Sequence, residues 1–165
     1  MSSLQLGVRR TLDRVSASAM ILAAAALFFM SLIQAWQVFA RYVLNDSPGW
    51  TEPVALLLMS FTVMLGASVA VRREAHFAFQ TLLHALSPMR QTVLKTVSRL
   101  IAAASGFGLM VLGGRLMIDD WSVAMAGAPL PSGLKFAALC VGGALILIFS
   151  LERLAFGDFK AEGEG

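Results

Sequence analysis

Side chains that could carry out chemistry are few in this sequence and lie far apart. The two histidines, His76 and His84, are eight residues apart, whereas two imidazoles that share a metal ion on one helix face are normally four apart. The single cysteine, Cys140, lies in an apolar run, so the chain has neither a disulfide framework nor a thiol pair. These patterns predict no catalytic site, no metal site and no bound cofactor.

The acidic side chains likewise indicate no catalytic site. Asp119 and Asp120 form an acidic cluster before Trp121, which is typical of a solvated turn or of a contact for a soluble partner. A small four-helix drug exporter would need a carboxylate in its first span, and residues 15–40 contain none. A haem-binding or quinone-linked membrane subunit would need intramembrane histidines or a cysteine pair. A small drug exporter and a haem-binding or quinone-linked membrane subunit are therefore the alternative classes for this chain.

The segments that carry these residues are strongly apolar. Of the 165 residues, 58% are hydrophobic and 14% are charged, whereas roughly a quarter of the residues of a soluble domain are charged. This charge is too little to cover a soluble surface, so apolar side chains must face lipid. The net charge of +3 comes from Lys and Arg residues in particular loops, and we therefore expect no nucleic-acid partner.

Four stretches are long enough to cross a bilayer. A hydrocarbon core about 30 Å thick requires roughly 20 apolar residues in a helix, because each residue rises about 1.5 Å. We predict transmembrane helices over residues 15–40, 53–71, 97–118 and 134–152. The expected fold class is therefore an all-α membrane protein, with residues 1–165 in a single membrane domain.

The distribution of basic residues predicts the orientation. Lys and Arg concentrate in cytoplasmic loops, and here they gather in the N-terminal tail and in the connection between the second and third spans. We therefore predict that both termini are cytoplasmic. Within that connection, residues 74–86 have apolar side chains on one side of a helical wheel, which predicts an amphipathic helix on the cytoplasmic membrane surface. The residues expected to contact membrane lipids are Arg72, Arg73, His76, Phe79, Leu82 and Leu86.

Small residues at helical spacing predict close contacts between helices. Thr62, Gly66 and Ala70 form one such ridge along the second span, and Ala138 with Gly142 forms a shorter one in the fourth. The pattern leaves open whether these ridges contact helices of this chain or of a partner.

A set of motifs at the ends of the first two spans resembles a known family. The motifs are Arg41-Tyr42, Trp50-Thr51-Glu52-Pro53, Gly66-Ala67 and Arg72-Arg73-Glu74-Ala75-His76. In order and spacing they are similar to the small, Q-type (DctQ-like) permease subunit of tripartite ATP-independent periplasmic (TRAP) transporters. The chain differs from the common pattern at Pro53, where a second Glu is frequent, and at Gln80, where an Asp is frequent.

The resemblance implies a transport role and no enzymatic activity. Such subunits lie in the bacterial inner membrane and pair with a large multi-span M-type permease subunit that holds the substrate and sodium sites. A periplasmic solute-binding protein, the P-type component, delivers an acidic solute, commonly a carboxylate, and the sodium gradient drives import. This chain would anchor the large subunit and help dock the binding protein. We expect partner contacts at Arg41, Trp50, Glu52, Thr62, Gly66, Ala70, Asp119 and Asp120.

Overall fold

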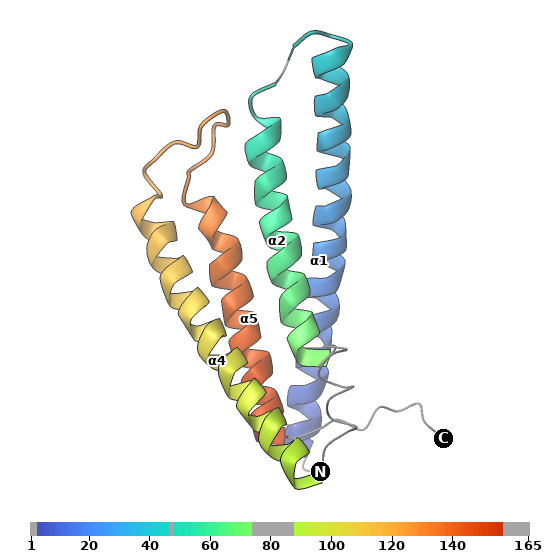
Figure 1. Cartoon of the computed structure of the whole chain (residues 1–165), viewed down its shortest axis with the longest axis vertical. Coiled ribbons are helices and arrows are strands. Elements are labelled where there is room, and N and C mark those ends of the chain that lie inside the picture. The colour runs from blue at the N-terminus through green and yellow to red at the C-terminus, as the bar shows by residue number, and fades with distance from the viewer. Residues whose placement is uncertain (1–2, 47, 74–87, 157–165) are drawn as a thin grey trace, which may run out of the picture.

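The computed structural model describes residues 3–46, 48–73 and 88–156. This part of the chain forms four α-helices, α1 (Ser3–Tyr42), α2 (Thr51–Arg73), α4 (Pro88–Asp119) and α5 (Leu134–Phe156) (Figure 1). Each is long and apolar enough to cross a membrane. The predicted all-α class with four transmembrane helices is confirmed. The amphipathic helix predicted over residues 74–86 lies outside the described residues.

The helices run alternately up and down and lie in the order α1, α2, α5, α4 across the molecule (Figure 1). The main contacts are between α1 and α2, between α2 and α5, and between α5 and α4. We call the end where α1 begins and α2 and α5 finish the Arg72 end, and the other the loop end. The Nη2 group of Arg9 in α1 donates to the carbonyl of Phe156 in α5 at 3.5 Å, so the first and last helices meet at the Arg72 end.

A tight turn joins α1 to α2 at the loop end. Asn45 has a φ of 53°, in the left-handed region that asparagine tolerates better than most residues. The hydroxyl of Thr51 donates to the carbonyl of Pro48 at 2.8 Å, and Glu52 follows in the first turn of α2. A carboxylate there interacts favourably with the positive end of the helix dipole. The α1–α2 connection therefore reverses the direction of the chain between the two helices.

The α4–α5 loop is longer and is held by its own backbone. An isolated antiparallel bridge joins Ala124 to Pro131, and the amide of Ser132 donates to the carbonyl of Val123 at 2.7 Å. Gly127 in this loop has a φ of 83° and lies against the backbone of Gly49 in the α1–α2 turn. A side chain at position 127 would be strained by this φ and would meet that backbone. The two connections at the loop end are therefore in direct contact.

Glycines allow α4 and α5 to approach each other closely. A Cβ atom added at Gly106 of α4 would lie 2.7 Å from the amide nitrogen of Leu147 and 2.9 Å from the carbonyl oxygen of Gly143. At Gly113 it would lie 2.9 Å from the amide nitrogen of Cys140. Both helices are thus in near backbone contact, the geometry that small residues permit in membranes.

The contact of α2 with its other neighbours also depends on small residues. Gly142 of α5 is buried against α2, where an added Cβ would lie 2.6 Å from the Cβ of Met64, so the close contact predicted for Gly142 is present within the chain. On the other side, Ala19 and Ala23 of α1 pack with Leu65 and Val69 of α2 in a buried cluster. α2 is therefore fixed between two helices.

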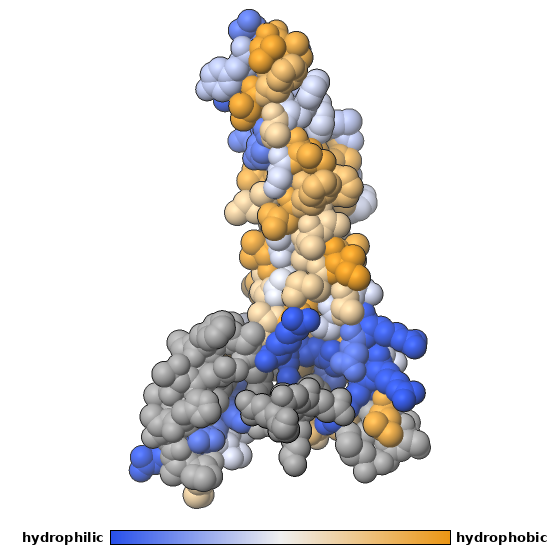
Figure 2. Space-filling view, turned by 90° about the vertical axis from the view of Figure 1, so that its right-hand side faces the viewer, coloured by the Kyte–Doolittle hydropathy of each residue, from blue (hydrophilic) through white to orange (hydrophobic). Residues whose placement is uncertain are grey.

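Large apolar side chains cover much of the outside. Figure 2, which faces the α1 side, shows hydrophobic residues along most of the length and hydrophilic residues gathered towards the Arg72 end. On α1 the exposed apolar residues include Ile21 at 69% and Phe28 at 61%, and on α4 they include Leu112 at 61%. A surface of this kind requires lipid or another apolar protein surface around it.

Candidate functional site

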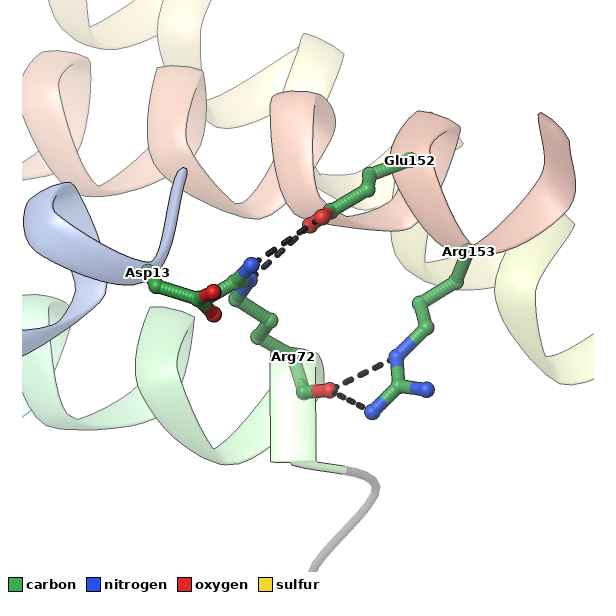
Figure 3. Close-up of polar contacts among 4 residues, drawn as sticks. All are labelled: Asp13, Arg72, Glu152 and Arg153. Atoms are coloured by element: carbon green, nitrogen blue, oxygen red, sulfur yellow. Dashed lines mark hydrogen bonds and ion pairs between the residues drawn. The ribbon is translucent and has the colours of Figure 1, made fainter. Parts of the chain in front are cut away.

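The polar centre of the molecule is Arg72, at the end of α2. Its side chain is 7% exposed, and its Nε and Nη2 groups donate to the two carboxylate oxygens of Glu152 at 2.9 and 3.0 Å. Its Nη1 group forms an ion pair with the carboxylate of Asp13 at 2.9 Å. The guanidinium therefore connects α1, α2 and α5 (Figure 3).

The next residue of α5 completes this group. Arg153 donates from Nε to the backbone carbonyl of Arg72 at 2.8 Å and also from Nη2. That carbonyl lies in the last turn of α2, where the helix leaves carbonyl groups without intrahelical partners. Arg99 of α4 in turn donates from Nη1 to the carbonyl of Arg153 at 3.2 Å. We call Asp13, Arg72, Glu152 and Arg153 the Arg72 cluster, which Figure 3 shows.

Burial makes these contacts structurally important. Glu152 is 4% exposed and its side chain 1%, whereas the side chain of Asp13 is 67% exposed. A buried charge is tolerated only where a partner and hydrogen bonds replace water, and a bidentate guanidinium–carboxylate pair supplies both. The ring of Phe149 lies beside the Arg72 guanidinium, with its centroid 5.3 Å from Cζ, and adds a cation–π contact.

This arrangement differs from the sequence prediction for Arg72. We expected this side chain to extend to lipid headgroups, but it is buried among α1, α2 and α5 because Glu152 and Asp13 supply its counter-charges. Arg73 is exposed, as a headgroup-facing residue would be. His76, Phe79, Leu82 and Leu86, also expected at the lipid surface, lie outside the described residues.

Five of the residues expected to contact a partner lie at the loop end. Arg41, Trp50, Glu52 and Asp119 are exposed, and Asp120 is partly buried. The carboxylate of Asp120 lies 3.9 Å from the Nζ of Lys135, and both of these side chains remain accessible. These residues lie at or next to the ends of α1, α2 and α4 at the loop end, where the two connections touch at Gly49 and Gly127.

The small residues along α2 differ in whether another helix of this chain lies next to them. The hydroxyl of Thr62 donates within α2 to the carbonyl of Leu58 at 2.9 Å and approaches the carbonyl of Ala23 in α1 at 3.4 Å. Ala70 is partly buried. At Gly66, by contrast, an added Cβ would meet no atom within 4 Å. The close contact predicted at Gly66 is thus absent within the described part of this chain, which leaves that position open to another molecule.

The described residues place their ionisable groups towards the ends of the helices. In α1, charged side chains occur in the first four turns and in the last turn. In α2 and α5, they occur only at the two ends of each helix. In α4, Lys95 and Arg99 precede the apolar run and Arg115 lies one turn from its end. Within residues 3–46, 48–73 and 88–156, no three His, Cys, Asp or Glu side chains are grouped so that they could hold a metal ion.

Comparison with known proteins gives a consistent assignment. Residues 30–157 match the family described as tripartite ATP-independent periplasmic transporters, DctQ component. The chain is 26% identical over 120 residues to the sialic acid TRAP transporter small permease protein SiaQ of Vibrio cholerae, an alignment that covers 72% of this chain and 69% of that one. It is also 28% identical over 93 residues to the C4-dicarboxylate TRAP transporter small permease protein DctQ of the same organism, covering 56% of this chain and 37% of that one.

Proposed function

The chain belongs to the DctQ family of TRAP transporter components, and on that basis we propose that it anchors the large permease subunit of a sodium-coupled importer of an organic acid. The family consists of transporter permease subunits, not enzymes, and this membership together with the four apolar helices makes the chain a multi-pass protein of the inner membrane. The match over residues 30–157 carries the proposal, since it includes the described parts of α2, α4 and α5 and the end of α1.

The position of the charges supports a scaffolding role. Ion or solute sites within a bilayer normally use ionisable or polar groups that face a cavity at mid-depth. In the described residues the buried charged residues are Arg72, Glu152 and Arg153, which lie together at one end of the helices and bind one another and the exposed Asp13. A chain with this arrangement is suited to hold a partner in place, while the M-type subunit binds sodium and the solute.

The open surface supports contact with a large membrane subunit. Gly66 gives α2 a position without a side chain that no residue of the described chain fills, and small residues permit close approach of a neighbouring helix. At the loop end, Arg41, Trp50 and Glu52 would contact the same subunit. Asp119 and Asp120 would contact the P-type binding protein, for which exposed carboxylates can provide electrostatic attraction.

The names of the relatives support the class of solute. One relative is named for sialic acid and the other for C4-dicarboxylates, and both compounds carry carboxylate groups. We therefore propose that the transporter containing this chain imports a small carboxylate.

Reconstitution tests this function directly. Proteoliposomes that contain this chain, the M-type subunit of the same transporter and the P-type binding protein should take up a labelled carboxylate when sodium is present outside. Omission of this chain, or replacement of sodium by potassium, should abolish uptake. Uptake of the solute by this chain in the absence of the M-type subunit would refute the scaffolding role, and uptake that persists in potassium would refute sodium coupling.

A further inference from the structure

The outer face of α4 carries a charged side chain inside its apolar span. Arg115 is exposed and lies four residues before Asp119, about 6 Å along the helix. It also lies 16 residues after Arg99, about 24 Å from the residue that joins α4 to α5 at the Arg72 end. Within the part of the chain that the structure describes, Arg115 has no ion pair, hydrogen bond or ring contact. A charge that faces the apolar region of a membrane without a counter-charge is costly, and such residues tend to be functional.

We propose that Arg115 pairs with a carboxylate on a transmembrane helix of the M-type subunit. This inference rests on the proposed function, which supplies that subunit as the membrane partner. It assigns to the assembly a second contact face, on α4, in addition to the one around Gly66 on α2.

The outer face of α4 points away from the rest of the chain. α4 lies at the edge of the molecule, where its main contacts are with α5 (Figure 1). Gly106 and Gly113 form the side next to α5, since a Cβ atom added at either position would lie within 3 Å of the α5 backbone. Successive residues of a helix are about 100° apart, so Arg115 is turned by about 200° from Gly113. An anion for Arg115 must therefore come from outside the described chain.

The direction of helical side chains favours a protein carboxylate over a lipid headgroup as this anion. Side chains of an α-helix lean towards its N-terminus, which for α4 is the Arg72 end. A guanidinium at position 115 therefore covers the preceding turn, nearer the middle of the span, whereas the nearest headgroups lie in the opposite direction, at the loop end. A carboxylate on a neighbouring transmembrane helix can lie at that depth.

Small residues on the same face leave room for such a helix. Ala104 and Gly108 lie eleven and seven residues before Arg115 and therefore share its face. Ala104 is exposed, and a Cβ atom added at Gly108 would meet no atom within 4 Å. Two small residues four apart allow a neighbouring helix to approach closely. A helix that packs at Gly108 passes within about two turns of Arg115, where its carboxylate can form a charge-assisted hydrogen bond.

A second copy of this chain does not fit this face. A symmetric pair of α4 helices that packs at Gly108 would bring the two Arg115 side chains to the same depth, where like charges repel. The acidic residues of the described chain lie near the helix ends or in the connections, and none lies at the depth of Arg115; they are Asp13, Asp46, Glu52, Asp119, Asp120 and Glu152. The carboxylate therefore belongs to a different membrane protein.

Co-purification of the M-type subunit with the tagged full chain tests this contact. Both are produced in the same bacterial membrane and extracted in detergent, and the M-type subunit recovered per amount of this chain is measured. Arg115→Gln should reduce this recovery about tenfold or more, because the partner carboxylate is then left unpaired in a desolvated contact. Arg115→Lys keeps the charge without the paired donors and should reduce recovery by less than about threefold. Gly108→Leu should also reduce recovery, because the leucine would hold the partner helix away.

Matched controls come from the same helix. Arg90 is exposed at the start of α4, before the apolar run, so Arg90→Gln should change recovery by less than about twofold. Phe107 is 55% exposed and is turned by about 100° from Gly108, so Phe107→Leu should have little effect. The melting temperature of the isolated chain should be nearly unchanged in Arg115→Gln and Gly108→Leu, because neither position contacts another described helix.

Four outcomes would overturn the proposal. If Arg115→Gln retains as much M-type subunit as the unmodified chain, the arginine has another role, and the scaffolding function stands without this contact. Equal losses in Arg115→Gln and Arg90→Gln would show a general effect of charge. A dimer of the isolated chain in native mass spectrometry that Arg115→Gln dissociates would assign the face to a second copy. Failure of the unmodified chain to retain the M-type subunit would refute the proposed function, and this inference with it.

Discussion

Arg72 and Glu152 are 80 residues apart in the sequence, yet their side chains form a buried bidentate ion pair with donor–acceptor distances of 2.9 and 3.0 Å. The net contribution of such a pair to stability is small, because removing both charges from water costs free energy. Loss of one partner is far more costly, since it leaves the other charge buried without compensation. The pair therefore favours the one arrangement of α2 and α5 in which both charges are satisfied.

Glu152→Gln should lower the stability of the chain in detergent by about 3 kcal/mol, the lower end of the range for breaking a buried pair, because Asp13 still faces Arg72. Reversible unfolding in a denaturing detergent measures this change. Asp13→Asn is the control, with an expected loss below about 1 kcal/mol since the Asp13 side chain is 67% exposed. Equal losses in the two variants would contradict the special role of the buried pair.

The glycines between α4 and α5 give a second prediction. Gly106→Ala should destabilise the chain by about 1–3 kcal/mol, because its Cβ would lie 2.7 Å from the Leu147 amide nitrogen and backbone atoms cannot move aside cheaply. Gly66→Ala, in which the new methyl group meets no atom within 4 Å, should leave the stability of the isolated chain almost unchanged. Comparison of the two melting temperatures in detergent checks this, and a loss in Gly66→Ala as large as in Gly106→Ala would contradict it.

Local composition was sufficient to predict the four helices, because apolar segments of this length have few alternatives in a bilayer. The start of α4 at Pro88 also follows from a local rule, since proline is favoured at the first helical position. The Arg72 cluster could not be predicted in this way. Nothing in the sequence next to Glu152 and Arg153 links them to Arg72, and their pairing with Arg72 depends on which helices become neighbours. The adjacency of α2 and α5 is a property of the whole bundle.

The pattern of small residues predicted only some of the close contacts between helices. It indicated close contact for Gly142, which packs on α2, and for Gly66, which is open in the described chain. It gave no weight to Gly106 and Gly113 of α4, although a Cβ atom added at either position would lie within 3 Å of the backbone of α5. A small residue permits close packing, but the position of the neighbouring helix decides whether the contact forms.

The orientation in the membrane is a further prediction. The Arg72 end holds the starts of α1 and α4, which are rich in arginine, so it should face the cytoplasm, and the loop end should face the periplasm. Fusions of an alkaline phosphatase and of a fluorescent protein at Gly165 and near Asp46 check this. Only the fluorescent protein should be active at Gly165, and only the phosphatase near Asp46. The reverse pattern would invert the topology.

Docking of the binding protein should depend on the acidic residues after α4. Replacement of both Asp119 and Asp120 by Asn should raise the concentration of binding protein needed for half-maximal uptake several-fold at low salt and less at high salt, because surface charges act mainly on association and are screened. Asp46→Asn is the matched control, since Asp46 is exposed at the same end but lies in the α1–α2 turn. Equal effects of the control and the double variant would remove the assignment to Asp119 and Asp120.

Assembly with the large subunit gives the last prediction. Gly66→Leu should reduce recovery of the M-type subunit with this chain and reduce uptake in parallel, because the leucine would occupy a surface position that a partner helix needs to approach closely. Glu52→Ala should act in the same direction by removing an exposed charge at the start of α2. Exposed Met59→Leu, which keeps a large apolar side chain on α2, is the control and should have little effect. Affinity purification followed by transport assays measures both quantities, while the melting temperature of each isolated variant should remain near that of the unmodified chain. The scaffolding role predicts that these changes alter the amount of assembled transporter without altering which solute it carries. A variant of Gly66 or Glu52 that assembles normally but changes solute preference would show that this subunit contributes to the solute site.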